Sequence, residues 1–113
     1  MTVRQLADTL SLTVLCEGDL DREVCGGYCG DLLSWVMSRA KANDAWFSVI
    51  GNVNAVAVCV LADVACLVLC ENAPFDEAAK VRAAAEGINV LRSDRTAYEL
   101  AAELSRCLDN TKR

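Results

Sequence analysis

Histidine is absent from this chain of 113 residues, and proline occurs only once. Without histidine, neither a Ser–His nor a Cys–His catalytic pair can be built, and histidine metal ligands are excluded as well. The chain also lacks a phosphate-binding run of the form G-x-x-x-x-G-K-S/T. Its clustered glycines, Gly26, Gly27 and Gly30, have neither that spacing nor a lysine after them. We therefore do not expect an enzyme.

Positive charge and long apolar runs are also scarce. Eleven Lys and Arg against 16 Asp and Glu give a net charge of −5, which disfavours binding to nucleic acid or to an anionic membrane. The longest apolar stretch, residues 53–70, is interrupted by Asn54 and Asp63, so no run reaches the roughly 20 residues of a membrane helix. The N-terminus lacks the cationic start and apolar run of a signal peptide. We expect a cytoplasmic protein.

Cysteine, in contrast, is abundant, with seven residues. Four of them lie in apolar runs, where a free cysteine behaves as a small buried hydrophobe: Cys16, Cys59, Cys66 and Cys70. The pairs Cys25-x3-Cys29 and Cys66-x3-Cys70 do not have the two-residue spacing of zinc knuckles or ferredoxin loops. We expect structural thiols, no metal and no cofactor. The alternative is a redox or metal-linked accessory protein that uses Cys25, Cys29, Cys66 and Cys70. In this alternative a helix N-terminus lowers the pKa of Cys25 and Cys29 and makes them reactive.

Apolar periodicity and turn residues predict alternating helices and strands. A capping box of Thr2 and Gln5 begins the first helix. Further helices are expected over residues 31–42, 53–64, 76–86 and 96–108, and strands over residues 12–16, 20–27, 45–50, 66–70 and 88–91. Gly87 closes the fourth helix and Ser93 or Asp94 caps the last, after which residues 109–113 fray. This order predicts an α/β fold of three layers, α/β/α, with a mostly parallel central sheet of about five strands.

The glycine-rich run over residues 21–31 is the most distinctive local feature. Gly26, Gly27 and Gly30 predict a tight strand-to-helix turn, and Asp31 is a suitable N-cap for the helix that follows. Arg22 precedes the turn, and its guanidinium suits a carboxylate or phosphate ligand. The alternative for this arginine is a salt bridge to a neighbouring carboxylate at position 21, 23 or 31.

Parallel sheets bind ligands beyond the carboxyl ends of their strands. The expected strands place four loops there: residues 26–31, 51–54, 71–73 and 92–96. The candidate ligand-binding residues are Arg22, Gly26, Gly27, Tyr28, Gly30, Asp31, Asn52, Asn54, Ser93, Asp94 and Thr96. The same residue types are common in ordinary turns and caps, which is the alternative for the whole set.

Three segments, residues 21–31, 45–70 and 87–98, resemble the DRTGG domain, an α/β module related to the N-terminal domain of HPr kinase/phosphorylase. Similar domains occur in some phosphotransacetylases and in CBS-containing family II inorganic pyrophosphatases. The resemblance implies one DRTGG-like domain over residues 1–113, of the stand-alone form. The chain has Gly-Asn-Val at residues 51–53 where the family usually has Gly-Asp-Arg, and Leu-Cys-Glu-Asn at residues 69–72 where Thr-Gly-Gly is usual.

We therefore expect a non-catalytic regulatory or interaction domain that senses a small ligand and forms a homodimer. One alternative is a sensor of nucleotides or other anions, and the other is the redox or metal-linked protein described above. A second copy, a further protein or a small anionic ligand is the expected partner. Trp35, Trp46 and the apolar helix over residues 53–64 are expected in the core or in an interface.

Overall fold

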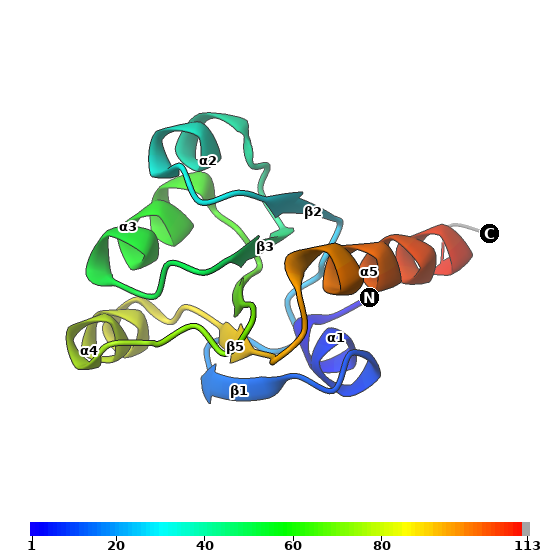
Figure 1. Cartoon of the computed structure of the whole chain (residues 1–113), viewed down its shortest axis with the longest axis horizontal. Helices are drawn as coiled ribbons and strands as arrows, with labels where there is room; N and C mark the ends of the chain where they lie inside the picture. Colours follow the sequence, from blue (N-terminus) through cyan, green and yellow to red (C-terminus); the bar gives the residue numbers. More distant parts are fainter. Residues whose placement is uncertain (112–113) are drawn as a thin grey trace.

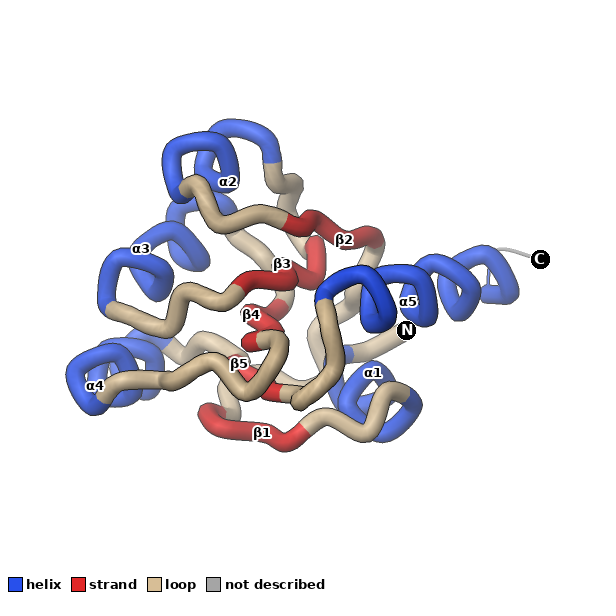
Figure 2. Tube along the Cα trace, viewed as in Figure 1, coloured by secondary structure: helices blue, strands red, loops and turns tan. Residues whose placement is uncertain are grey.

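The computed structural model describes residues 1–111, in which five strands form a single sheet (Figures 1 and 2). The strands are β1 (Thr13–Cys16), β2 (Gly26–Cys29), β3 (Asp44–Ser48), β4 (Cys66–Leu69) and β5 (Val90–Arg92). The helices are α1 (Val3–Thr9), α2 (Leu33–Arg39), α3 (Val53–Ala62), α4 (Glu77–Glu86) and α5 (Ala97–Thr111). The strand order is β1-β5-β4-β3-β2. Strands β2 to β5 run parallel, and β1 lies antiparallel to β5.

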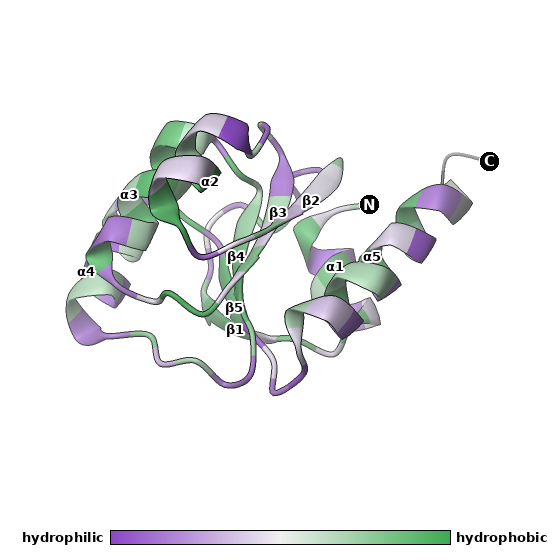
Figure 3. Ribbon diagram, turned by 45° about the horizontal axis from the view of Figure 1, so that its top comes forward, coloured by the Kyte–Doolittle hydropathy of each residue, from purple (hydrophilic) through white to green (hydrophobic). Residues whose placement is uncertain are grey.

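Helices cover both faces of this sheet, as Figures 1 and 3 show. Because successive strand residues point to opposite faces, Trp46 and Leu67 pack with α2, α3 and α4, while Phe47 and Val68 pack with α1 and α5. The result is a three-layer α/β/α fold with a mostly parallel sheet, as predicted. No helix among the described residues has the length and apolar character needed to cross a bilayer.

The start of α1 and the end of α4 follow the chemistry expected from the sequence. Thr2 accepts from the backbone N of Gln5, and the Gln5 side chain accepts in return from the backbone N of Thr2, which completes a capping box. Asn52 caps α3 and Asp76 caps α4. Gly87 ends α4 with a φ of 67°, a left-handed conformation that glycine adopts without strain. These ends fix where the loops at each end of the sheet begin.

The expected tight turn over residues 26–31 is wrong, because Gly26–Cys29 forms β2 itself. Each residue of this strand pairs in parallel with β3, from Gly26 opposite Asp44 to Cys29 opposite Phe47. Sheet pairing thus overrides the low strand propensity of the glycine pair. A Cβ on Gly27 would lie 3.3 Å from Leu104 Cδ2, so glycine lets α5 pack closely on β2. The expected strand over residues 20–27 is irregular chain up to β2.

Helix α2 is shorter than predicted and has a narrower buried face. It begins at Leu33 instead of Asp31, and its N-cap position, Leu32, makes no side-chain cap. Val36 is its one fully buried residue, whereas Trp35 is 51% exposed, with the Arg39 guanidinium 3.6 Å from its ring centroid. Trp46 is fully buried, so the two tryptophans have different surroundings.

The last helix, α5, is longer than predicted. Thr96 is its cap: Thr96 Oγ1 accepts from the backbone N of Glu99, and the Glu99 carboxylate accepts from the backbone N of Thr96. The expected cap Ser93 instead accepts from the backbone N of Arg95, within the preceding turn. Of the tail expected to fray, residues 109–111 are helical, and residues 112–113 lie outside the described residues.

Candidate functional site

At the amino ends of the parallel strands, Arg22 connects the turns that precede β3 and β4. Its Nε donates to Asn43 Oδ1 at 2.9 Å, and its Nη2 donates to Asp63 Oδ1 at 2.8 Å and to the Asp63 backbone oxygen. Asn43 and Asp63 have φ values of 68° and 58°, which place them in the turns that lead into β3 and β4. The guanidinium therefore forms a salt bridge, as the alternative for Arg22 expected, although with Asp63 and not with a neighbour in sequence.

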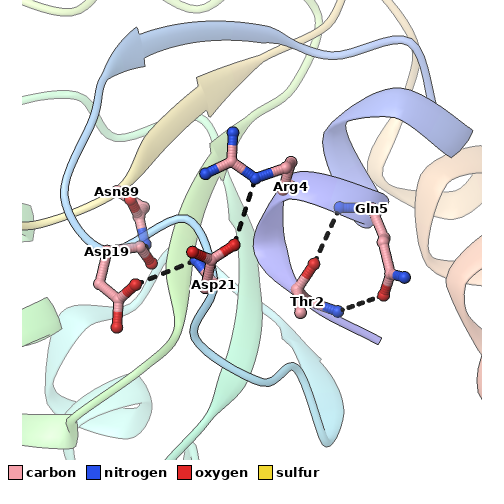
Figure 4. A network of polar contacts seen from close by, with 6 residues as sticks. All are labelled: Thr2, Arg4, Gln5, Asp19, Asp21 and Asn89. Atoms are coloured by element: carbon pink, nitrogen blue, oxygen red, sulfur yellow. Dashed lines mark hydrogen bonds and ion pairs between the residues drawn. The ribbon is translucent and has the colours of Figure 1, made fainter.

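The Asn89 side chain forms hydrogen bonds with backbone groups at the same end of the sheet. It is 2% exposed; its Oδ1 accepts from Gly18 N at 2.7 Å, and its Nδ2 donates to the backbone oxygens of Asp19 and Ala65 at 2.8 and 3.1 Å. Figure 4 shows Asn89 beside Asp19, whose carboxylate accepts from the backbone N of Asp21. The amino end of the sheet is thus held together by side chains that bond to this chain's own backbone.

At the carboxyl ends of the strands, Asp31 connects the loops that follow β2 and β3. Its Oδ1 accepts from Ser48 Oγ at 2.7 Å and from Val49 N at 3.0 Å. Just before it, the backbone oxygen of Gly30 accepts from Trp46 Nε1 at 2.9 Å. Asp31 is therefore a link between loops and not the helix cap that the sequence predicted. Within the described part of the chain, its other oxygen, Oδ2, has no hydrogen bond.

The loop after β4 is a tight turn built on two left-handed residues. Glu71 and Asn72 have φ values of 55° and 53°, and Ala73 N donates to Cys70 O at 3.0 Å. The backbone N atoms of Glu71 and Asn72 donate to Arg95 O and Ser93 O, which joins this turn to the loop after β5. Two successive non-glycine residues in this region are uncommon.

Beside this turn lies a polar depression of about 270 Å³, which we call the carboxyl-end hollow. It is lined by Ser11, Thr13, Asn72, Arg92, Ser93 and Asp94. Thr13 is opposite Arg92 because β1 pairs antiparallel with β5. Among residues 1–111, no ion pair or hydrogen bond engages the Arg92 guanidinium, which is partly exposed. The hollow thus combines one available cation with hydroxyl, amide and carboxylate groups.

Four residues of this hollow escaped the sequence analysis. Arg92 ends the last apolar strand, and this position is the signal that could have identified it. Ser11 and Thr13 carry no such signal, because only the pairing of β1 with β5 brings them to this end of the sheet. Asn72 was within an expected loop but was not selected.

The other predicted site residues divide among three places. Asn52, Asn54, Ser93, Asp94 and Thr96 lie with Asp31 at the carboxyl end of the sheet. There Asn52 and Thr96 act as helix caps, and Asn54 is exposed in the first turn of α3. Gly26, Gly27 and Tyr28 lie along β2, at the free edge of the sheet, and Gly30 follows that strand. Arg22 lies at the opposite end. The structure does not bring the predicted set together in one cavity.

Three of the seven cysteines are buried, whereas Cys25 and Cys29 are exposed. Burial raises the pKa values of Cys59, Cys66 and Cys70 to about 12. Burial, and then the nearby Asp31 carboxylate, also raise the pKa of Cys29, so the lowered value considered for that thiol is wrong. Among the described residues, no three Cys, Asp or Glu side chains are placed to share a metal ion.

Comparison with known proteins identifies a structural relative. No family model matches the chain, and no curated protein matches it. Its fold is similar to a crystal structure of the CBS and DRTGG domains from the regulatory region of a Clostridium perfringens pyrophosphatase, complexed with the activator diadenosine tetraphosphate. The TM-score is 0.69 at 13% sequence identity, over 89% of this chain and 44% of the other. The chain thus spans less than half the length of that relative and shares the fold of part of it.

Proposed function

We propose that residues 1–113 form a non-catalytic regulatory domain of the DRTGG type that senses a small anionic ligand, with a nucleotide as the preferred class. The observation that carries this proposal is the carboxyl-end hollow, where the Arg92 guanidinium lacks a partner among the described residues. Ligands of parallel α/β sheets bind at this end. Six of the cysteines are free thiols, which suits a reducing compartment, so we place the domain in the cytoplasm: Cys16, Cys25, Cys29, Cys59, Cys66 and Cys70.

The groups around Arg92 suit a nucleotide better than a simple anion. A guanidinium binds phosphate oxygens in a bidentate manner, and the hydroxyls of Ser11, Thr13 and Ser93 can donate to further phosphate oxygens. Asp94 accepts hydrogen bonds and repels phosphate, so it fits a ribose hydroxyl. The hollow therefore offers separate positions for a phosphate and a sugar.

Two further observations support a regulatory role. The pyrophosphatase region with the same fold was crystallised with a dinucleotide activator, which makes diadenosine tetraphosphate a reasonable first probe. The turn at Glu71 and Asn72 holds two left-handed residues against the loop that contains Ser93. Strained backbone of this kind often occurs in ligand-binding loops.

The proposal is tested by isothermal titration calorimetry with inorganic phosphate, adenosine triphosphate and diadenosine tetraphosphate. We expect at least one nucleotide to bind and Arg92→Gln to weaken that binding by about tenfold or more, since a charge-assisted hydrogen bond contributes roughly 1.5–3 kcal/mol. Arg106→Gln is the matched control, because it removes the same charge from the exposed side of α5. Absence of binding to every probe, or unchanged binding by Arg92→Gln, would contradict the proposal.

We also propose that the domain acts as a homodimer. The chain is 54% hydrophobic, and several large apolar side chains remain exposed on the layer formed by α2 and α3, including Leu32, Trp35 and Leu61. Exposed apolar residues in this number suit a protein that is partly covered by a partner. Light scattering that finds a monomer at every concentration would refute this part alone.

A further inference from the structure

A second polar hollow lies between β2 and the chain that leaves α2, and it has a volume of about 340 Å³. We call it the Asp44 hollow. Its volume is near the lower end of the range for small-molecule sites, roughly 300–1,000 Å³. Its lining includes two residues of β2, two at and after the end of α2, and the first residue of β3: Gly26, Tyr28, Arg39, Lys41 and Asp44.

Asp44 is a buried carboxylate with one oxygen that lacks a partner. The residue is 7% exposed, and its Oδ2 accepts from the backbone N of Lys41 at 2.8 Å. Within residues 1–111, Oδ1 accepts no hydrogen bond and forms no ion pair. Asp44 thus differs from Arg22 and Asn89, whose polar atoms at this end of the strands are bonded to the chain itself. Because a buried carboxylate oxygen without a donor is unfavourable, a donor on a ligand would stabilise it.

Gly26 keeps the space beside this oxygen clear. It lies opposite Asp44 in the pairing of β2 with β3. A Cβ on Gly26 would lie 2.9 Å from Asp44 Oδ1, a closer approach than such atoms normally make. Glycine inside a strand weakens it and often marks a position that another group approaches closely. A ligand at Oδ1 gives this glycine such a role.

Arg39 and Lys41 supply the positive charge of the hollow. The Arg39 guanidinium lies 3.6 Å from the centroid of the Trp35 ring, a contact that favours one position for this cation. Both cationic side chains are exposed. Among the described residues, neither forms an ion pair with Asp44 or with any other carboxylate.

Two other acidic side chains near the start of β2 are engaged away from this hollow. Asp21 pairs with Arg4 at 3.2 Å, and Glu23 pairs with the amino group of Met1 at 3.0 Å. Neither acidic residue lines the hollow. The charged groups that do line it are therefore one carboxylate and two cations, and none of the three has an ionic partner in the described part of the chain.

These charges suit a ligand that carries both signs. A simple anion would bind to Arg39 and Lys41 but would leave Asp44 Oδ1 without a donor. A simple cation would bind to Asp44 but would be repelled by the other two groups. A zwitterion meets both needs, because its ammonium group donates to Oδ1 and its carboxylate accepts from the guanidinium. An α-amino acid carries these two groups on one carbon atom, which suits a hollow of this size.

We propose that the Asp44 hollow binds a free α-amino acid, with the ammonium group at Asp44 and the carboxylate at Arg39 and Lys41. Tyr28, which is half-buried in the same hollow, lies where it can contact the side chain of the ligand. This inference goes beyond the nucleotide site proposed above and does not depend on it. The two sites are separate, because β2 lies at the opposite edge of the sheet from the pair of β1 and β5.

Isothermal titration calorimetry at low salt with the standard α-amino acids tests the proposal. We expect at least one of them to bind. Its N-acetyl derivative, which lacks the ammonium group, and its carboxamide, which lacks the carboxylate, should each bind about tenfold or more weakly, because each loses a charge-assisted hydrogen bond. Absence of binding to every amino acid, or equal binding of either derivative, would overturn the proposal.

Substitutions locate the binding. Arg39 is exposed, so Arg39→Gln should fold normally and weaken binding of that amino acid by about tenfold or more, while the matched control Arg106→Gln leaves it unchanged. Asp44→Asn keeps an acceptor for the backbone N of Lys41 but removes the negative charge, and we expect a similar loss. If Asp44→Asn does not fold, Lys41→Gln takes its place, because Lys41 is exposed. Unchanged affinity in Arg39→Gln, or in the Asp44 variant or its replacement, would overturn the site.

The two ligand proposals can fail separately. Arg92→Gln removes the cation of the carboxyl-end hollow and should leave amino-acid binding as in the wild type. Loss of amino-acid binding in this variant would overturn the Asp44 hollow as its site. Nucleotide titration of the wild type tests the other proposal, whatever the amino acids show.

Discussion

The two ends of the parallel strands use polar side chains differently. At the amino end, Arg22 and Asn89 bond to neighbouring turns and backbone groups of the chain itself. At the carboxyl end, Arg92, Asn54 and one oxygen of Asp31 have no such partner within the described residues. The comparison separates polar residues that hold the fold together from those that remain free to meet a ligand. Residue type alone does not make this distinction, since both ends contain arginine, asparagine and aspartate.

The largest expected effect is the loss of Asn89. Asn89→Ala leaves the backbone oxygens of Asp19 and Ala65 and the N–H of Gly18 without their partner, which we expect to lower the free energy of unfolding by about 3 kcal/mol. Asn54→Ala, at the carboxyl end, should change it by less than about 0.5 kcal/mol because Asn54 is exposed. Urea denaturation measures both. Equal effects would show that the two ends do not differ in this way.

A second prediction concerns the thiols of Cys66 and Cys70, at the two ends of β4, because burial raises the pKa of both. Cys66 begins β4 and Cys70 follows it, and the pKa of each rises from 9.0 to about 12 on folding. Above pH 9 the unfolded chain loses these protons while the folded chain keeps them. The free energy of unfolding should therefore fall as the pH rises from 9 towards 12 and show no thiol contribution below 9.

Urea denaturation one pH unit below and one above pH 9 measures this loss. Cys66→Ala should reduce the loss by up to about 1.4 kcal/mol, because the variant has no thiol to titrate at that position. The comparison is between the two pH values for each protein, so any direct effect of the substitution on packing cancels. If Cys66→Ala showed the same loss as the wild type, this thiol would not be the cause.

The smallest expected effect is the gain in stability when a residue with a positive φ is replaced by glycine, compared between the two ends of the sheet. Glu71→Gly should raise stability by about 0.5–1 kcal/mol, because glycine adopts a φ of 55° without the cost that a Cβ imposes. Asp63→Gly relieves the same strain at a φ of 58° but removes the carboxylate that accepts from Arg22, so we expect no gain or a loss. Thermal denaturation compares the two variants. A gain from Asp63→Gly as large as that from Glu71→Gly would contradict the structural role given to the Arg22 ion pair.

Local patterns predicted the parts of this fold that local chemistry determines. The capping box at Thr2, the end of α4 at Gly87 and the alternation of apolar segments all depend on residues within a few positions of each other. The order α, β, α then follows, and with it the three layers. The parallel sheet could be inferred because helices separate most of its strands.

Features that depend on pairing between distant segments could not be predicted in this way. Gly26 and Gly27 have low strand propensity, and only β3 makes them a strand. From its place in the sequence, Asp31 is expected to be a helix cap. In the structure its carboxylate instead accepts a hydrogen bond from Ser48, at the end of the neighbouring strand β3. The carboxyl-end hollow depends on Thr13 lying opposite Arg92, a contact that no local pattern contains.

The antiparallel pairing of β1 with β5 also sets the order in which this protein can be completed during synthesis. Leu6 and Leu10 share a buried cluster with Leu91, Leu100 and Leu104, which are made much later. Until these later residues are made, the early apolar side chains lack part of the cluster that buries them. Of the five strands, β1 is made before the others but gains its neighbour β5 last, and a chain that stops before β5 leaves β1 without its place in the sheet.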